Sequence, residues 1–151
     1  MDEQALAFLQ QHPAASMITL RPAGSPHAVR VAIAVVDGRI QSSGTRTRKR
    51  TAYLRRDPRS TLFVFDNEWR WLTLECDVTI LDGPDVPQQS VRLFRTMQVN
   101  VTPAPPPGKI LWYGAPKSEE EFLTIMRDEQ RIIYEFNVKR AYGMYGEMPG
   151  R

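Results

Sequence analysis

The dipeptide Asp37-Gly38 limits what this chain can fold into more than any other feature of the sequence. An Asp-Gly pair readily adopts the positive φ angles of a two-residue β-hairpin turn, which joins neighbouring antiparallel strands. The residues on both sides fit strands, predicted over 27–36 and 39–43. Side chains alternate along a strand, so four apolar residues of the first strand share one face: Val29, Val31, Ile33 and Val35. The centre of the chain is therefore expected to form an antiparallel sheet.

Similar patterns continue on both sides of this hairpin. Further strands are expected at 15–21, 60–65, 69–81 and 131–137, where β-branched and aromatic residues recur. Helices are expected between Asp2 and Pro13 and over 45–56, 86–97 and 118–129, the last of which begins with a capping box from Ser118 to Glu121. Short strands joined by hairpins favour an antiparallel barrel. The expected fold is therefore mainly β, a barrel with a few helices.

Size and composition are those of a single globular domain spanning 1–151. The chain is 42% hydrophobic and 25% charged, which suits a folded protein with a buried core. We expect an ordered core over about 5–143 and a tail over 144–151. The N-terminus lacks the features of a signal peptide, and no apolar stretch approaches the ~20 residues that span a bilayer. Cys76 is alone, so no internal disulfide forms and a cytoplasmic location is expected.

A strongly basic segment follows the hairpin. Seven Lys or Arg residues lie between positions 46 and 59. The unit from Ser42 to Thr51 combines hydroxyls, a helix start and basic side chains, which are the donors that a phosphate needs. Two or three charge-assisted hydrogen bonds of about 1.5–3 kcal/mol each would hold a phosphorylated cofactor. A solvated basic helix face is an equally open interpretation of these residues alone, since no Walker or dinucleotide-fold glycine pattern is present.

The order of motifs around this segment resembles a known family. The run T-R-K-R-T-A-Y-L-R-R-D-P-R over 47–59, followed by the strand S-T-L-F-V-F, is similar to the pyridoxamine 5'-phosphate oxidase-like split β-barrel family. Within it, the run resembles the branch that uses flavin or the deazaflavin coenzyme F420. The first hairpin, the strand W-L-T-L-E-C-D-V-T-I-L and the ending R-A-Y-G fit as well, so the resemblance covers about 5–143. It implies a split β-barrel of the FMN-binding type.

The resemblance also implies a homodimer with cofactor sites at the subunit interface. The phosphate-binding pair falls on Lys49 and Arg50, the ring system faces the strand 27–31, and Ser42 and Ser43 make hydroxyl and main-chain contacts. The full set of implied or suggested cofactor-binding residues is His27, Val29, Arg30, Val31, Ser42, Ser43, Arg46, Arg48, Lys49, Arg50 and Arg55. One departure from the family pattern is Glu75-Cys76, where Glu-Gly is frequent.

The surplus of arginine separates two candidate cofactors. Coenzyme F420 carries a phosphate and a glutamate tail, and it therefore needs a longer basic groove than FMN. Four arginines offer such a groove, although ordinary solvation would also explain them: Arg46, Arg48, Arg55 and Arg56. We therefore expect an oxidoreductase that transfers hydride from reduced F420 to a small organic acceptor, with FMN as the alternative cofactor. The cofactor carries the reaction, so no covalent catalyst is required of the protein.

Other functions and sites stay open beside this one. The chain could be an FMN-dependent enzyme of the pyridoxamine-phosphate type, or a cofactor carrier without turnover. Nucleic-acid binding is disfavoured because few aromatic residues lie among the arginines. Trp69 and Trp71 are expected on one strand face, either in a pocket wall or in packing. No metal-ligand spacing is present, and Cys76 reads as a small buried residue rather than a nucleophile.

Overall fold

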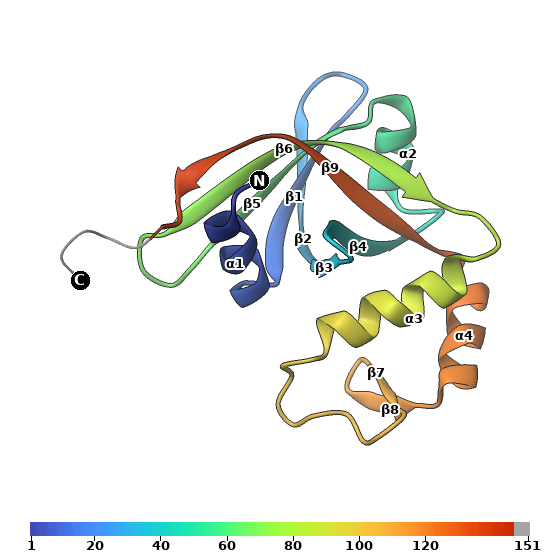
Figure 1. The fold of residues 1–151 in the computed structure, drawn as a ribbon. Helices are drawn as coiled ribbons and strands as arrows, with labels where there is room; N and C mark the ends of the chain where they lie inside the picture. Colours follow the sequence, from blue (N-terminus) through green and yellow to red (C-terminus); the bar gives the residue numbers. More distant parts are fainter. Residues whose placement is uncertain (147–151) are drawn as a thin grey trace.

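The computed structural model describes residues 1–146, which form a curled sheet with four helices and a small second sheet (Figure 1). The helices are α1 Glu3–Gln11, α2 Lys49–Arg56, α3 Val86–Met97 and α4 Glu119–Asp128. The strands of the main sheet are β1 Ala14–Leu20, β2 Pro26–Ala32, β3 Ala34–Val36, β4 Arg39–Thr45, β5 Arg59–Phe65, β6 Trp71–Leu81 and β9 Arg131–Met144. The small sheet pairs β7 Ile110–Trp112 with β8 Ala115–Lys117.

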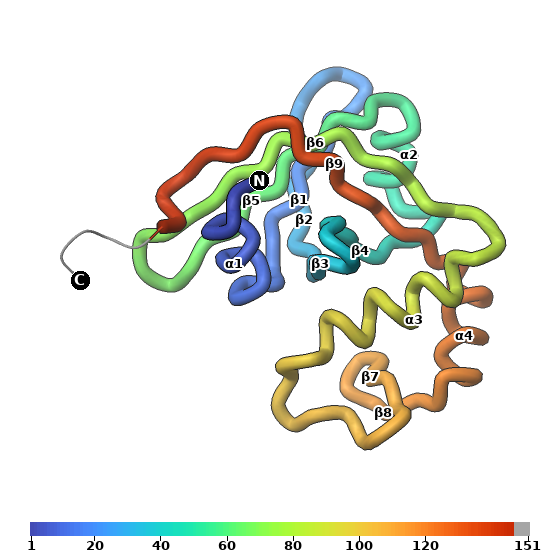
Figure 2. Tube along the Cα trace, viewed as in Figure 1, coloured from blue at the N-terminus to red at the C-terminus, as the bar shows by residue number. Residues whose placement is uncertain are grey.

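The main sheet closes into a barrel because its two outer strands are neighbours in the chain. The strand order is β2-β1-β5-β6-β9-β4-β3, with every pairing antiparallel. β2 and β3 lie at opposite ends of this order but are separated in the chain by Ile33 alone. The sheet must therefore curl until its ends meet, which gives the mainly β, split-barrel architecture expected from the sequence (Figure 2).

Ile33 corrects the prediction of one continuous strand over 27–36. Its side chain is buried in the core, and its amide donates to the Pro13 carbonyl oxygen at 2.8 Å instead of to a sheet neighbour. The alternating pattern passes through this corner unchanged, so the sequence does not mark it. The hairpin prediction is confirmed: Asp37 and Gly38 have φ angles of 50° and 77°, and Val36 pairs with Arg39.

Several other boundaries differ from the sequence prediction, and the largest differences have physical causes. β6 begins at Trp71, not at Trp69, because Asp66 accepts hydrogen bonds from the amides of Glu68 and Arg70 and closes a loop there. The two tryptophans therefore do not share a strand face, which corrects that prediction. Helix α2 begins at Lys49 because Thr45 still belongs to β4. β9 continues past 137 to Met144 by pairing with the first half of β6, and the rest of the expected tail, 147–151, lies outside the described residues.

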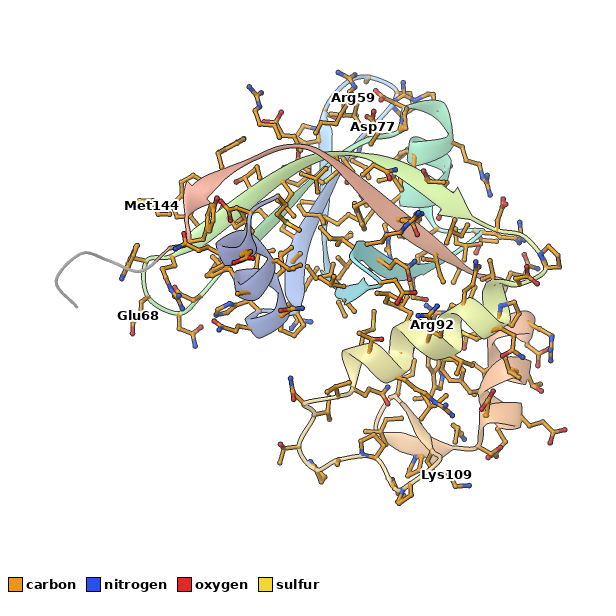
Figure 3. The ribbon with its side chains drawn as sticks, in the orientation of Figure 1. Arg59, Glu68, Asp77, Arg92, Lys109 and Met144 are labelled. Atoms are coloured by element: carbon orange, nitrogen blue, oxygen red, sulfur yellow. The ribbon has the colours of Figure 1, made fainter. Side chains whose placement is uncertain are left out.

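Helices α3 and α4 and the β7–β8 hairpin form a helical unit, residues 86–128, beside the barrel (Figure 1). Ser118 and Glu121 make the capping box predicted for α4. The unit has its own apolar cluster of Val91, Ile110, Phe122 and Met126. In Figure 3, Arg92 lies where α3 meets the barrel, whereas Glu68 and Met144 lie at the barrel's other end. Within residues 1–146, none of the helices has the length and apolarity of a membrane span.

Cys76 lies in the barrel core beside an irregularity in the β6–β9 pairing. The register shifts between Glu75 and Cys76, at the position where this chain departs from the family pattern. The Cys76 side chain is buried, as the sequence predicted. Burial raises the pKa of the thiol to about 12, and the neighbouring carboxylates of Asp77 and Glu75 act in the same direction.

We expect Cys76 to resist alkylation while the protein is folded. The thiolate is the reactive form, and at about pH 8 a buried thiol with a raised pKa holds almost none of it. Iodoacetamide treatment followed by intact-mass spectrometry should show no adduct in native protein and one adduct after unfolding in guanidinium. Rapid labelling of the native protein would contradict the packing of this strand.

Candidate cofactor-binding site

A pocket of about 630 Å³ lies between the barrel and the helical unit. Its barrel wall is lined by Arg30, Val31, Ala32, Ser42, Ser43, Arg48, Arg50 and Arg131. Its opposite wall comes from the end of α3, the segment after it and the β7–β8 hairpin: Phe94, Met97, Gln98, Val101, Leu111, Trp112, Tyr113 and Gly114. This volume falls within the range of about 300–1,000 Å³ typical of cofactor and small-molecule sites.

The barrel wall lies where the sheet is split between β2 and β4. Ser42 on β4 donates its hydroxyl to the Ala32 carbonyl oxygen at 2.7 Å, which bridges the two strands where no ladder joins them. The next residue, Ser43, holds a buried hydroxyl oxygen that has no partner within residues 1–146. Since buried polar atoms are nearly always hydrogen-bonded, an unpaired hydroxyl in a pocket indicates a place for a ligand atom.

Arg50 is the second unpaired group at this wall. Its guanidinium lies over the Tyr134 ring, 5.5 Å from the ring centroid, and its Nε atom is buried without an acceptor in the described chain. Burial lowers the pKa of Arg50; Tyr134 opposes this shift, and Arg48 and Arg131 reinforce it. An arginine nevertheless stays protonated in proteins. The pocket therefore holds a cation that has no counterion among residues 1–146 and that lies near two other positive charges.

Charge in the pocket has one sign. Its lining includes Arg30, Arg48, Arg50 and Arg131, and none of the acidic residues of the described chain. Arg48 and Arg50 stand at the start of α2, where the first helical amides have no acceptor inside the helix. A helix start with adjacent guanidinium groups is a favourable environment for a phosphate.

The structure places the remaining predicted residues outside the pocket. Arg46 and Arg55 both contact the Asp82 carboxylate, at 3.6 Å and 2.9 Å, and Arg46 also donates to the Asp82 carbonyl oxygen. Arg56, proposed with them for the groove, donates to the Leu20 carbonyl oxygen. Lys49 is exposed on α2 and does not line the pocket. The predicted residues found in the lining are Arg30, Val31, Ser42, Ser43, Arg48 and Arg50.

His27 and Val29, the other two predicted residues, lie on β2 before it reaches the pocket. The His27 ring packs edge-on against Tyr53 at 5.4 Å, and its Nδ1 atom is buried without a partner in the described chain. Burial lowers the pKa of His27 below its ordinary value of 6.5, and the positive charges of Arg21, Arg50 and Lys49 lower it further. The imidazole is therefore neutral at neutral pH.

We expect His27 to make folding stability depend on pH below about 6.5. Its pKa is lower in the folded state, so the unfolded chain binds the proton more tightly and stability falls as the pH drops below the unfolded value. Urea unfolding of wild type and His27→Gln at about pH 7.5 and 5.5 would measure this contribution. The variant should lose less stability than wild type between the two pH values; an equal loss would contradict a buried neutral imidazole.

Nothing in the sequence indicated that Arg131 or two aromatic residues of the opposite wall, Trp112 and Tyr113, line a site. Trp112 and Tyr113 lie on the β7–β8 hairpin, whose turn residues Tyr113 and Gly114 have φ angles of 48° and 80°. A Tyr-Gly turn between three-residue strands lacks the Asn-Gly or Asp-Gly signature, so the hairpin went undetected. Arg131 was assigned to the last strand on its β-rich surroundings, and only the pairing of Thr45 with Arg131 brings it beside the basic segment.

The two tryptophans singled out from the sequence lie outside the pocket lining, as do Tyr134 and Tyr145. Trp71 contacts Phe63 and Tyr142. Trp69 lines a separate surface hollow together with Trp71 and Phe63. Tyr145 donates to the Asp2 carboxylate at 2.8 Å. Tyr134 is fully buried beneath Arg50, so it supports the pocket without lining it.

Comparison with known protein families shows which family has this sequence pattern. The sequence profile described as pyridoxamine 5'-phosphate oxidase matches residues 1–142, nearly the whole chain. The chain belongs to the pyridoxamine 5'-phosphate oxidase family. Membership confirms the resemblance drawn from the basic segment and its flanking strands, and it agrees with the split barrel of the structure. No curated protein sequence matches this family member.

Solved structures share the fold of this pyridoxamine 5'-phosphate oxidase family member at low identity. A conserved hypothetical protein from Mycobacterium tuberculosis has a TM-score of 0.72 and 20% identity, over 100% of this chain and 92% of its own. A protein described as an F420 reductase has a TM-score of 0.60 and 18% identity, over 89% and 93%. A FAD-binding protein from Mesorhizobium loti has a TM-score of 0.61 and 10% identity, over 93% and 89%.

Proposed function

We propose that this chain binds a flavin-type cofactor in the pocket between β4 and the β7–β8 hairpin, and that it is an oxidoreductase using reduced coenzyme F420. The observation that carries the proposal is the pair of buried, unpartnered donors, Arg50 Nε and Ser43 Oγ. Both belong to residues that line a pocket with four arginines and no carboxylate. Such donors are costly to bury without an acceptor, and a phosphorylated ligand supplies one.

The residues present fit the two parts of such a cofactor. Arg48 and Arg50, at the start of α2, would hold its phosphate, with the Ser43 hydroxyl as a further donor. Val31 and Ala32 on one side, and Phe94 and Met97 at the end of α3 on the other, would bound its ring and exclude water. When bound, the cofactor supplies the hydride chemistry, and the protein orients it. In this proposal the substrate proton comes from solvent or from the Tyr113 hydroxyl, since the lining holds Tyr113 but no carboxylic acid or histidine.

Arginine supports F420 over FMN, but through different residues than the sequence suggested. Arg46, Arg55 and Arg56 have acceptors within the protein and contribute less to a groove. Arg30 instead joins Arg48 and Arg50 in the lining, which gives the cofactor three arginines, whereas the fourth, Arg131, is paired with Glu129. That is more than one phosphate group requires, and it suits a ligand with further anionic groups. A solved structure described as an F420 reductase shares the fold, while a FAD-binding neighbour keeps FMN as the second candidate.

We also propose that the protein works as a homodimer whose second subunit covers this pocket. Exposed apolar residues belong to its lining or follow it closely in the chain: Tyr113 is 86% exposed and Val101 39%, and Val99, two residues before Val101, is 72% exposed. Apolar side chains that cluster on a surface in this way commonly mark an interface. Size-exclusion chromatography with light scattering would measure a mass near twice 17.3 kDa if the proposal holds, and a monomer would refute it.

Cofactor titration tests the central proposal. Purified protein is titrated separately with F420 and with FMN while cofactor fluorescence is followed. Tight binding of F420 with weak or no binding of FMN supports the F420 proposal, and the reverse result selects the FMN enzyme. Binding of neither refutes a flavin-type site. Reduced cofactor and a panel of acceptors then distinguish an enzyme from a carrier, because a carrier oxidises no cofactor in their presence.

A further inference from the structure

The aromatic residues of the wall opposite the α2 start gather around Arg131, a buried arginine of the barrel wall. The Arg131 guanidinium lies over the Trp112 ring, 4.9 Å from its centroid. The Trp112 ring is also edge-on to Tyr113 at 5.0 Å and packs against Phe94 at 5.6 Å. All four residues line the pocket. Aromatic faces with a cation behind them favour flat, conjugated molecules.

Arg131 is a buried cation that has one carboxylate partner, Glu129, within the described residues. It is 9% exposed, and its Nε and Nη2 atoms both donate to the same oxygen of Glu129, at 3.0 Å and 2.7 Å. Within residues 1–146, this carboxylate oxygen is the only side-chain acceptor of the guanidinium. A guanidinium fork can hold a carboxylate with two parallel hydrogen bonds to two oxygens. Glu129 occupies the Nε and Nη2 atoms, so the Nη1 end of the guanidinium is the part suited to bind a second carboxylate, from a ligand.

The Arg131 cluster lies beside, and not within, the phosphate-binding part of the pocket. Arg131 begins β9 and pairs with Thr45, before the turn that leads to Arg48 and Arg50. It is close enough to Arg50 to lower the pKa of that residue. A ligand held by Arg131 and Trp112 would therefore be adjacent to a cofactor anchored at the α2 start. This is the position that a substrate needs.

We propose that Arg131, Trp112 and Tyr113 form the acceptor subsite of this pocket, and that it accepts flat, conjugated carboxylic acids. That the bound acid is the hydride acceptor rests on the proposed cofactor function, whereas recognition of the acid depends only on these three residues. Arg131 binds the carboxylate, and the Trp112 and Tyr113 rings contact the conjugated part. Glu129 competes with the ligand for the same guanidinium and so limits the affinity.

Isothermal titration calorimetry with trans-cinnamate and its neutral amide tests this subsite, in protein with and without F420. One charge-assisted hydrogen bond is worth about 1.5–3 kcal/mol, so the acid should bind about tenfold or more tightly than the amide. Arg131→Met should remove this preference. Arg131→Lys, which keeps the charge but not the fork, should retain part of it and serves as the folding control.

Glu129→Gln gives the sharpest result, because it removes the competing carboxylate at the exposed end of α4. It should tighten cinnamate binding severalfold and leave the amide unchanged. Weaker cinnamate binding in Glu129→Gln, or equal affinity of folded wild type for acid and amide, would overturn the proposal. Acid preference without any cofactor binding would instead refute the proposed function alone and leave the carboxylate site standing.

Discussion

The double substitution Arg48→Ala/Arg50→Ala should lower cofactor affinity by about 10²–10⁴-fold, because it removes two charge-assisted hydrogen bonds of about 1.5–3 kcal/mol each. Both side chains line the pocket at the start of α2, and Arg50 holds a buried donor without an acceptor. The loss should be similar for F420 and FMN, since both carry a phosphate. Fluorescence titration of each cofactor measures it.

Lys49→Ala is the matched control for this experiment. Lys49 lies between the two arginines in sequence, and its replacement by Ala also removes a positive charge. The Lys49 side chain, however, is exposed and does not line the pocket. Its affinity change should stay below about threefold at physiological salt, where charges on the exposed surface are largely screened. If Lys49→Ala weakened binding as much as the double variant, the phosphate would lie on the outer face of α2, as the family resemblance alone implied.

Gly44→Ala should lower the free energy of unfolding by about 3 kcal/mol, because the added methyl group overpacks a site that has no room for it. A Cβ atom at this position would lie 2.4 Å from the Tyr134 Oη atom and 2.5 Å from two ring carbons. Tyr134 cannot move aside readily, since it is fully buried and its hydroxyl contacts Thr51. For a chain of this size the melting temperature should fall by roughly 6–12 °C.

A double-mutant cycle shows whether the clash with Tyr134 is the cause. Tyr134→Ala alone creates a cavity and should cost about 3–5 kcal/mol. Gly44→Ala should add little in that background, because the ring it would strike is gone, so the two costs should fall short of additivity by at least about 1 kcal/mol. Gly83→Ala is the control: a Cβ at Gly83 meets nothing within 4 Å, and its cost should lie within about 0.5 kcal/mol of zero. Additive costs would place the strain of Gly44→Ala elsewhere.

Local patterns predicted the parts of the fold that local chemistry decides. Asp37-Gly38 marked a hairpin because few residues tolerate its φ angles, and Ser118 and Glu121 marked the start of α4 through a reciprocal cap. The basic segment indicates a phosphate site, which stays a prediction; its residue Arg50 and the nearby Ser43 line the pocket. Each of these signals depends on residues close together in the chain.

Features made by distant residues were not visible in the sequence. The corner at Ile33 depends on the Pro13 carbonyl, and the length of β9 depends on pairing with β6. Asp82 draws Arg46 and Arg55 away from the pocket across a separation of about thirty residues, whereas the pairing of β4 with β9 brings Arg131 in. Proximity in the sequence therefore led us to expect Arg46 and Arg55 in the groove, although both pair with Asp82. It gave no reason to expect Arg131, which β9 brings to the pocket.

The separate apolar clusters of the barrel and the helical unit give the pocket a mechanical role. The barrel is organised around residues such as Leu62 and Leu74, the helical unit around Phe122 and Met126, and a smaller set including Leu93 and Ile133 joins them. Since cooperative units of a protein can separate before the whole unfolds, we expect the barrel and the helical unit to separate at this junction first. A ligand that contacts both walls binds only while the two units are packed together. Its binding should therefore stabilise their packing against separation.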